Sequence, residues 1–240
     1  IDVRGGIVVP AGDIRLETRD TLTLAADLAR IDVGARARLD TRGTWTNDNP
    51  FFDPVLGPVY RNGGSVSVMG NGGSGVFLAR GSVIDVSGGA WLDADGHLKA
   101  GNAGSIDLRA VGTGESGIVP PRLIADATLA GYALGRGGSL RLDAPSLCIG
   151  NAACAAAAGL RIDPTLFQQG GFNRFSINAN QGGLTVARDA LIRPLAQSWL
   201  LAPGYAFQPS GANLVLFTRR EILPDIERAP ATLSLSANAR

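Results

Sequence analysis

Three residue types that favour helices, Glu, Lys and Met, are scarce in this sequence. Its 240 residues include only 4 Glu, 1 Lys and 1 Met, which are among the residue types that favour helices most. Turn-forming residues are abundant instead, with 17 Asp and 33 Gly. The composition therefore predicts an all-β chain that turns often and runs extended between its turns, and it argues against a helical protein.

An excess of charge and a long apolar run are also missing. The net charge is +1, the sequence pI is about 8.0, and acidic and basic residues are interspersed. A nucleic-acid-binding domain usually has a basic stripe or a pI above about 9, so no nucleic-acid partner is expected. The apolar run at 152–160 is far shorter than the roughly 20 residues of a membrane span, so no span is expected either.

Motifs for catalysis and metal binding are absent as well. There is no GxSxG, HExxH, CxxC or Walker-type glycine loop, and His97 is the only histidine. We therefore expect no catalytic residue, no cofactor and no metal site. Cys148 and Cys154, in LCIGNAAC, are either a small disulfide-closed loop made in an oxidising compartment or two unrelated buried thiols. Their isolation and close spacing favour the disulfide.

A block of sequence is repeated within the chain. IDVGARARLDTRG (31–43) and IDVSGGAWLDADG (84–96) share seven of thirteen residues without a gap, at an offset of 53. IDVRGG (1–6) also resembles IDVSGG (84–89). We interpret these copies as the same corner of different coils, and residue 1 as lying inside a coil of a longer repetitive protein.

A second phrase, glycine followed by serine and a short alternating strand, recurs as GGSVSV (63–68), AGSIDL (103–108) and GGSLRL (137–142). GDIRL (12–16) and FSINA (175–179) are weaker copies. Alternation with period two places the apolar residues of a strand on one face. The same alternation is read at Leu184/Val186, Leu214/Leu216 and Leu233/Leu235.

Repeated glycine corners and short alternating strands predict a parallel β-helix, or β-solenoid. Three strands would make a turn of roughly 25 residues, so that two turns give the observed block. A β-sandwich is the competing architecture, but it does not explain the 13-residue repeat. We expect coils over 1–190 with loop insertions at 43–64, 110–122 and 147–171, then less regular terminal coils or a cap over 191–240. A short helix is possible at 218–230.

The phrases GSVIDVSGG (81–89), NAGSIDLRA (102–110) and GRGGSLRLDAP (135–145) resemble the filamentous-haemagglutinin-like large exoproteins of Gram-negative bacteria. The resemblance implies a right-handed parallel β-helix in a secreted or surface-displayed protein, exported through an outer-membrane transporter by the two-partner secretion pathway. It implies adhesion, aggregation or biofilm formation and no catalytic residues. The family's secretion domain is not evident, so this chain is expected to be an interior or carboxy-terminal segment. The cysteine pair is unusual for the family.

Aromatic residues are the best candidates for ligand contacts. Exposed aromatic rings can stack on sugars or enter a partner's pocket, and the alternative is that they cover the flank of the solenoid. Trp199, Tyr205 and Phe207 form another cluster, which is more typical of a terminal cap or a contact with the next module. The candidate contacts are Trp45, Phe51, Phe52 and Tyr60 in the 43–64 loop, and Trp91 in the repeat.

Two other functions remain open. A polysaccharide-cleaving β-helix enzyme needs two carboxyl groups about 5–9.5 Å apart, for which Asp93 with Asp95, or Asp32 stacked on Asp85, are candidates. Recurrence of these positions in the repeat favours a structural role. A purely structural spacer would bury the aromatics of 43–64. Our first expectation is an adhesive rod, not an enzyme, whose loops contact a glycan or protein on host cells or other bacteria.

Overall fold

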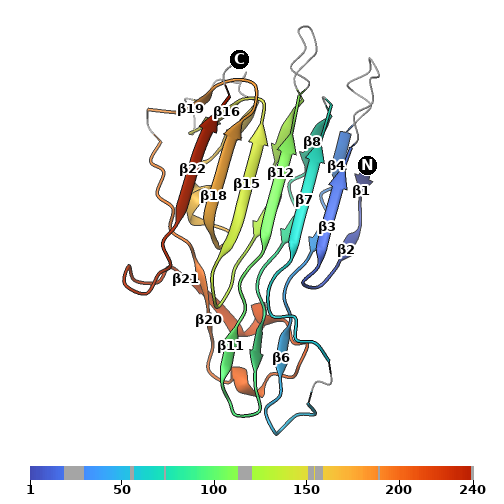
Figure 1. Ribbon diagram of the computed structural model, residues 1–240, viewed down its shortest axis with the longest axis vertical. Coiled ribbons are helices and arrows are strands. Elements are labelled where there is room, and N and C mark those ends of the chain that lie inside the picture. The colour runs from blue at the N-terminus through green and yellow to red at the C-terminus, as the bar shows by residue number, and fades with distance from the viewer. Residues whose placement is uncertain are drawn as a thin grey trace.

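The computed structural model describes residues 1–18, 30–54, 57–72, 74–112, 121–150, 154, 159–188 and 190–238. It is all-β, with mainly parallel strands. Six parallel strands form one sheet, in which they stand side by side across the molecule from the N-terminal to the C-terminal part of the chain (Figure 1). We call this sheet the third, because the chain enters it after two other sheets on each of four successive passes. Its strands are β3 (Asp13–Glu17), β7 (Ser65–Gly70), β12 (Ser105–Ala110), β15 (Gly138–Ala144), β18 (Phe172–Ala179) and β22 (Thr232–Ala237).

Two further parallel sheets have four strands each and follow the same order along the chain. The first sheet contains β1 (Asp2–Val3), β4 (Arg30–Val33), β8 (Gly75–Leu78) and β13 (Leu123–Ala125). The second sheet contains β2 (Gly6–Val8), β5 (Arg38–Asp40), β9 (Val83–Asp85) and β14 (Thr128–Ala130).

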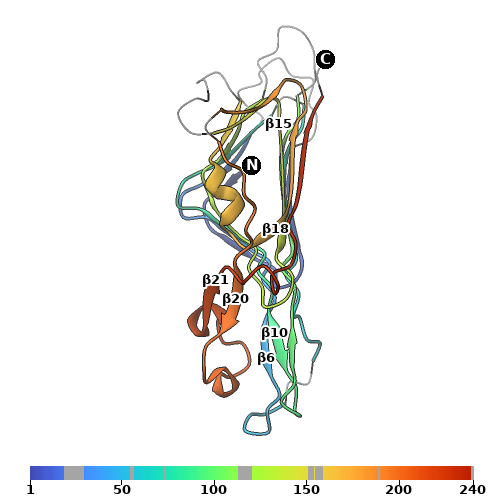
Figure 2. The same ribbon diagram turned by 90° about the vertical axis from the view of Figure 1, so that its left-hand side faces the viewer.

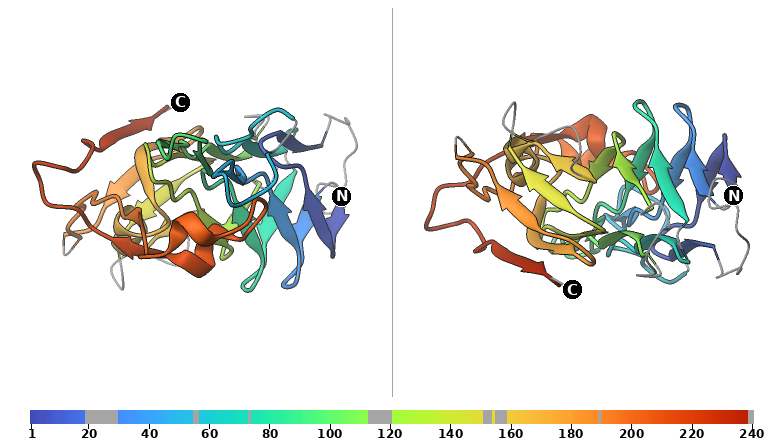
Figure 3. Two further views of the ribbon diagram at one scale, coloured as in Figure 1. Left: turned by 90° about the horizontal axis from the view of Figure 1, so that it is seen from below. Right: turned by 90° about the horizontal axis from the view of Figure 1, so that it is seen from above.

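The chain visits the first, second and third sheets in that order on four successive passes. Seen along the long axis of the molecule, the passes follow one another from the N-terminal side to the C-terminal side (Figure 3). Side chains from all three sheets meet in one continuous apolar core. In the third sheet, period-two alternation sends the same register row inward: Ile14, Val66, Ile106, Leu140 and Phe175.

The glycine-serine phrase is confirmed as a structural repeat. Ser65, Ser105 and Ser139 are register partners on neighbouring strands. The preceding glycines allow the backbones of successive passes to touch: a Cβ atom on Gly104 would lie 1.7 Å from the carbonyl oxygen of Gly64. Only glycine can occupy such a contact, which explains why this residue recurs at the corner.

The interpretation of the IDV copies as one corner is wrong. Residues 1–3 and 31–33 lie in the first sheet, where Asp2 is the partner of Asp32. The copy at 84–86 begins in the second sheet, where Ile84 is the partner of Leu39. Residues 84–86 and 31–33 therefore have the same sequence although they begin in different sheets. They match because the strands of both sheets alternate between inward and outward side chains.

The estimate of 25 residues per turn is also wrong. Ile14 pairs with Val66, 52 residues later, so the repeated block is one pass and not two. The next two passes take 40 and 34 residues, from Val66 to Ile106 and from Ile106 to Leu140. Each pass is longer than three short strands require because loops and extra strands are inserted between the sheets.

The insertions contain regular structure of their own. Within 43–64 lies β6 (Trp45–Asn47), which pairs in parallel with β10 (Ala90–Leu92), and β10 pairs in antiparallel with β11 (Leu98–Ala100). Within 147–171 lie β16 (Leu147–Ile149), β17 (Leu160–Ile162) and the 3₁₀ helix η1 (Pro164–Gln168); β16 pairs with β17 and with β19 (Leu184–Val186). Residues 113–120 of the 110–122 insertion lie outside the described residues.

Strands β6, β10 and β11, with the described residues of 48–62, project from one side of the stack; we call them the lateral extension (Figure 1). Residues 198–221, the covering segment, lie against this extension (Figure 2). The segment contains β20 (Ser198–Leu201), which pairs in antiparallel with β21 (Thr218–Glu221), and the 3₁₀ helices η2 (Tyr205–Phe207) and η3 (Leu214–Phe217).

Two local expectations for the terminal region are wrong. Leu214 and Leu216 lie in η3 and not in a strand, because Asn213 accepts a hydrogen bond from the backbone N–H of Val215 and caps a helical turn. The possible helix at 218–230 is instead strand β21 followed by turns. Strand pairing with β20 provides hydrogen-bond partners that an isolated short helix would lack.

Candidate ligand-contact surface

The β6–β10–β11 sheet has two faces, and Trp45 lies on the covered one. Its side chain is 2% exposed, and its indole Nε1 donates a 3.0 Å hydrogen bond to the carbonyl of Gln208. The ring packs edge-on against Phe217 and Tyr205, at centroid distances of 5.3 and 6.3 Å. Trp45 therefore does not belong to the exposed contacts that its loop position suggests, and it anchors the covering segment.

Trp91 lies on the opposite face. It is the register partner of Thr46 on β6 and of Lys99 on β11. Its Nε1 donates a 2.7 Å hydrogen bond to Oδ2 of Asp48, and the Lys99 ammonium lies 4.0 Å from the ring centroid. Trp91 is half-buried, so a hydrogen bond and a cation–π contact hold an accessible ring in one orientation.

Phe51 and Tyr60 are the most exposed of the candidate aromatics, at 80% and 50%, and Phe52 is half-buried. The backbone that carries them is tied down. The N–H of Phe51 donates to Oδ1 of Asn49, and the carbonyl of Tyr60 accepts a 2.7 Å hydrogen bond from Thr44. The exposed rings of Phe51 and Tyr60 are available to contact a partner.

Charged groups surround Trp91 on the β10–β11 hairpin. Oδ1 of Asp93 accepts a 2.7 Å hydrogen bond from the backbone N–H of His97, and Oδ2 lies 3.2 Å from the Lys99 ammonium. The His97 hydrogen bond is the main cause of a lowered pKa at Asp93, which stays ionised at neutral pH. Possible ligand atoms of Asp93, Asp95 and His97 lie within 4.8 Å of one another, but Lys99 already neutralises Asp93, and we derive no metal site.

The stacking of Asp32 on Asp85, considered for glycoside hydrolysis, is not found. Asp85 is instead the register partner of Asp40. Both carboxylates contact the same two arginines: Arg38 lies 3.0 Å from Asp40 and 3.4 Å from Asp85, and Arg42 lies 2.8 and 3.7 Å from them.

Environment separates the pKa values of these two carboxyls. Burial raises the pKa of Asp85, despite its hydrogen bonds from Ser87. Burial also opposes ionisation of Asp40, but the hydrogen bonds from Arg42 and Arg38 and the charge of Arg42 outweigh it and lower the pKa. Divergent pKa values occur in hydrolases. Here the Asp40 and Asp85 side chains are only 6% and 10% exposed and share their arginines, which fits a structural ion-pair network.

A crevice of about 200 Å³ separates this network from the covering segment. Asp40, Arg42 and Trp45 line one side, and Trp199 and Asn213 line the other. Nη1 of Arg42 donates a 3.2 Å hydrogen bond to Oδ1 of Asn213 across it. Polar groups on the two sides are therefore hydrogen-bonded to each other, and this contact helps to hold the covering segment against the rest of the molecule.

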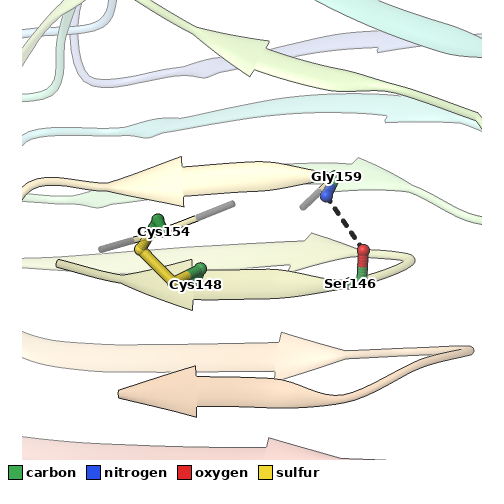
Figure 4. The surroundings of a disulfide bond; sticks show 4 residues. All are labelled: Ser146, Cys148, Cys154 and Gly159. Atoms are coloured by element: carbon green, nitrogen blue, oxygen red, sulfur yellow. Dashed lines mark hydrogen bonds between the residues drawn. A yellow bond between two sulfur atoms is a disulfide. The ribbon is translucent and has the colours of Figure 1, made fainter. Parts of the chain in front are cut away.

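The cysteine pair is a disulfide in the structure. The Cα atoms of Cys148 and Cys154 lie 5.7 Å apart and both side chains are buried (Figure 4). Nearby, the backbone N–H of Gly159 donates a 2.9 Å hydrogen bond to Oγ of Ser146 (Figure 4). These contacts join Cys154 to β16 and Gly159 to Ser146, the residue that precedes β16.

Comparison with known protein families, curated proteins and solved structures finds no match to this chain. Among the described residues, no helix has the length and apolar character needed to cross a bilayer.

Sequence reasoning missed the partners that hold the surface. Asp48 and Lys99 fix Trp91, and Asn47 donates to the carbonyls of Ala206 and Gln208. One signal was available, because the turn residues Asp95 and Gly96 mark a hairpin that brings the strands of Trp91 and Lys99 together. Of the predicted Trp199 cluster, Trp199 is 3% exposed and stacks on Tyr132 with ring centroids 5.9 Å apart, whereas Phe207 is 70% exposed.

Proposed function

We propose that this chain is a segment of a right-handed parallel β-helix from a secreted or surface-displayed adhesin-like exoprotein. It acts as a stiff rod whose lateral extension contacts a glycan or protein on host cells or on other bacteria. Export of the parent protein by the two-partner pathway, through an outer-membrane transporter, belongs to the same proposal and rests on the sequence resemblance.

The order of the strands supports the β-helix. Four passes through the same three sheets, with parallel pairing between passes, are what a solenoid produces. Crossovers between parallel strands are right-handed in about 98% of cases, which favours the right-handed form. Dense pairing of backbone groups along the stack would give a rod that holds its shape under load.

The exposure of Phe51 and Tyr60 carries the adhesive role. A spacer has no need of solvent-facing aromatics, and it would bury them against the flank. Trp45 is buried, as the spacer hypothesis predicts, but Phe51 is 80% exposed and Tyr60 is 50% exposed. Aromatic side chains of this kind supply much of the contact energy at protein surfaces, so the lateral extension is the favoured contact region.

The hydrolase alternative has weaker support. Its best carboxylate pair, Asp40 and Asp85, is buried and bound by Arg38 and Arg42. Asp93 and Asp95 lie close together, but Asp93 is engaged by Lys99 and by the backbone of His97. A general acid needs access to the leaving group, and the arginine network obstructs that access.

Binding of the purified 240-residue chain to a glycan array and to epithelial and bacterial cells tests the proposal. The informative variant is the double change Phe51→Ala and Tyr60→Ala, because it spares the buried Trp45. The matched control is Phe207→Ala, which removes a 70% exposed ring from the covering segment. Circular dichroism and urea unfolding should show that all three proteins fold alike.

We expect the wild-type chain and the Phe207→Ala variant to bind, and the double variant to lose at least about tenfold in affinity, since each tenfold step is about 1.4 kcal/mol. Absence of binding by the folded wild-type chain would favour the spacer. Equal binding by the double variant would show that the contact surface lies outside the 43–64 loop.

A further inference from the structure

The lateral extension is unevenly charged, although the whole chain is nearly neutral. Residues 43–62 contain Asp48, Asp53 and Arg61, and residues 88–102 contain Asp93, Asp95 and Lys99. Four acidic and two basic residues give this region a net charge of −2 with His97 neutral. The covering segment, residues 198–221, carries its charged residues only in β21, where Arg219, Arg220 and Glu221 give a net charge of +1.

The lysine of this region does not offer a free positive site. Its ammonium lies 3.2 Å from Oδ2 of Asp93 and 4.0 Å from the centre of the Trp91 ring. An incoming anion would have to displace Asp93 from Lys99, and Asp95 stands on the same hairpin, with a carboxylate oxygen within 4.8 Å of one on Asp93. The positive charge of Lys99 is therefore already compensated beside the Trp91 ring.

We infer that the lateral extension selects uncharged, hydroxyl-rich glycans and disfavours sialylated or sulphated ones. This inference rests on the proposed adhesive function and names the ligand class of the same surface. Ionised carboxylates only accept hydrogen bonds, so they complement the hydroxyl groups of a neutral sugar. They repel a carboxylate or sulphate brought close to them, and like-charge contacts at interfaces are strongly unfavourable.

The affinity for neutral oligosaccharides should exceed that for acidic ones by about tenfold at physiological ionic strength. The difference in affinity should shrink as salt is added, because the Debye length falls from about 8 Å at 0.15 M to about 3 Å at 1 M ionic strength. Salt should weaken the repulsion of acidic sugars and leave the neutral sugars nearly unaffected.

The experiment compares lactose-terminated oligosaccharides with their sialylated and sulphated forms, at 0.05, 0.15 and 0.5 M salt as roughly spaced steps across this screening range. Wild-type chain is run beside the double variant Asp53→Lys and Asp95→Lys, which changes the charge of the extension from −2 to +2. The control, Asp126→Lys and Asp225→Lys, makes the same change in total charge at exposed positions elsewhere in the described structure.

Preference for the neutral forms, reversed in the Asp53/Asp95 variant and retained in the control, is the expected result. A wild-type chain that prefers acidic glycans through Phe51 and Tyr60 would overturn this inference while the proposed adhesive function stands. An unchanged preference in the Asp53/Asp95 variant would also overturn it. Failure to bind any glycan would contradict both this inference and the proposal that the chain binds glycans.

Discussion

The indole nitrogen of Trp45 donates a hydrogen bond to the carbonyl oxygen of Gln208, 163 residues later in the chain. Asn47, two residues further along β6, is fully buried and donates to the same carbonyl at 2.8 Å. Its backbone N–H also bonds to Oγ of Ser210. One strand of the lateral extension thus holds the covering segment through side chains as well as through apolar packing.

Replacing Trp45 should therefore release the covering segment. Trp45→Ala removes a buried ring and the hydrogen bond to Gln208, and we expect a loss of about 3–5 kcal/mol in the free energy of unfolding. Urea unfolding measures the loss, and limited proteolysis at 202–213 should accelerate. Trp91→Ala is the control, since that ring is half-buried and should cost less. Equal losses for both variants would contradict the anchoring role.

Gly104 should tolerate no side chain. A Cβ atom there would lie 1.7 Å from the carbonyl oxygen of Gly64 and 2.7 Å from its carbonyl carbon. Gly104→Ala should therefore separate two passes at a corner, and the variant should unfold at markedly lower urea than wild type or fail to fold. Gly183→Ala is the control, because no atom lies within 4 Å of its Cβ position. Similar stability of the two variants would refute the corner contact.

Asp40 should stabilise the folded chain at neutral pH and lose this effect in acid. Its pKa in the folded chain is lowered, since Arg42 and Arg38 outweigh the opposing effect of burial. The stabilisation is therefore present above the unfolded pKa of about 3.9 and is lost as the pH falls through the folded value. Asp40→Asn, which breaks a buried ion pair, should cost up to about 3–5 kcal/mol at pH 7. A loss that is the same at pH 7 and pH 2.5 would contradict this assignment.

Asp85 should have the opposite pH dependence. Burial raises its pKa, so the cost of keeping it ionised is present above the folded value and disappears as the pH falls toward about 3.9. Urea unfolding from pH 7 to pH 4 should show this contribution in wild type and not in Asp85→Asn. Identical pH profiles for the two proteins would show that the pKa of Asp85 is not raised.

The disulfide should contribute a modest stabilisation. Cys148 and Cys154 are six residues apart, and closing so short a loop in the unfolded chain is worth about 2 kcal/mol. Reduction should lower the urea midpoint of wild type by the corresponding amount. The variant carrying both Cys148→Ala and Cys154→Ala should start lower and be insensitive to reductant. A midpoint in wild type that does not respond to complete reduction would refute the expectation.

The strands of the third sheet were predictable from sequence because their signal is local. Alternation places Val66 and Val68 on the inner face without reference to any other strand, and the preceding glycines mark the corner. The contact surface was only partly predictable. Phe51 and Tyr60 are exposed as a loop position suggests, but neighbouring residues on the chain gave no indication that Trp45 would be covered by residues near Gln208.

The sequence by itself determined the all-β class, the mainly parallel strands and the glycine corners, since side-chain alternation and backbone crowding act over a few residues. Tertiary structure alone decided which copies stack. Asp85 is matched by sequence to Asp32 but pairs with Asp40, because Asp32 lies in the first sheet and Asp85 in the second. It also decided which aromatics reach solvent, since Trp45 is buried by residues near Gln208, which lies 163 residues later in the chain.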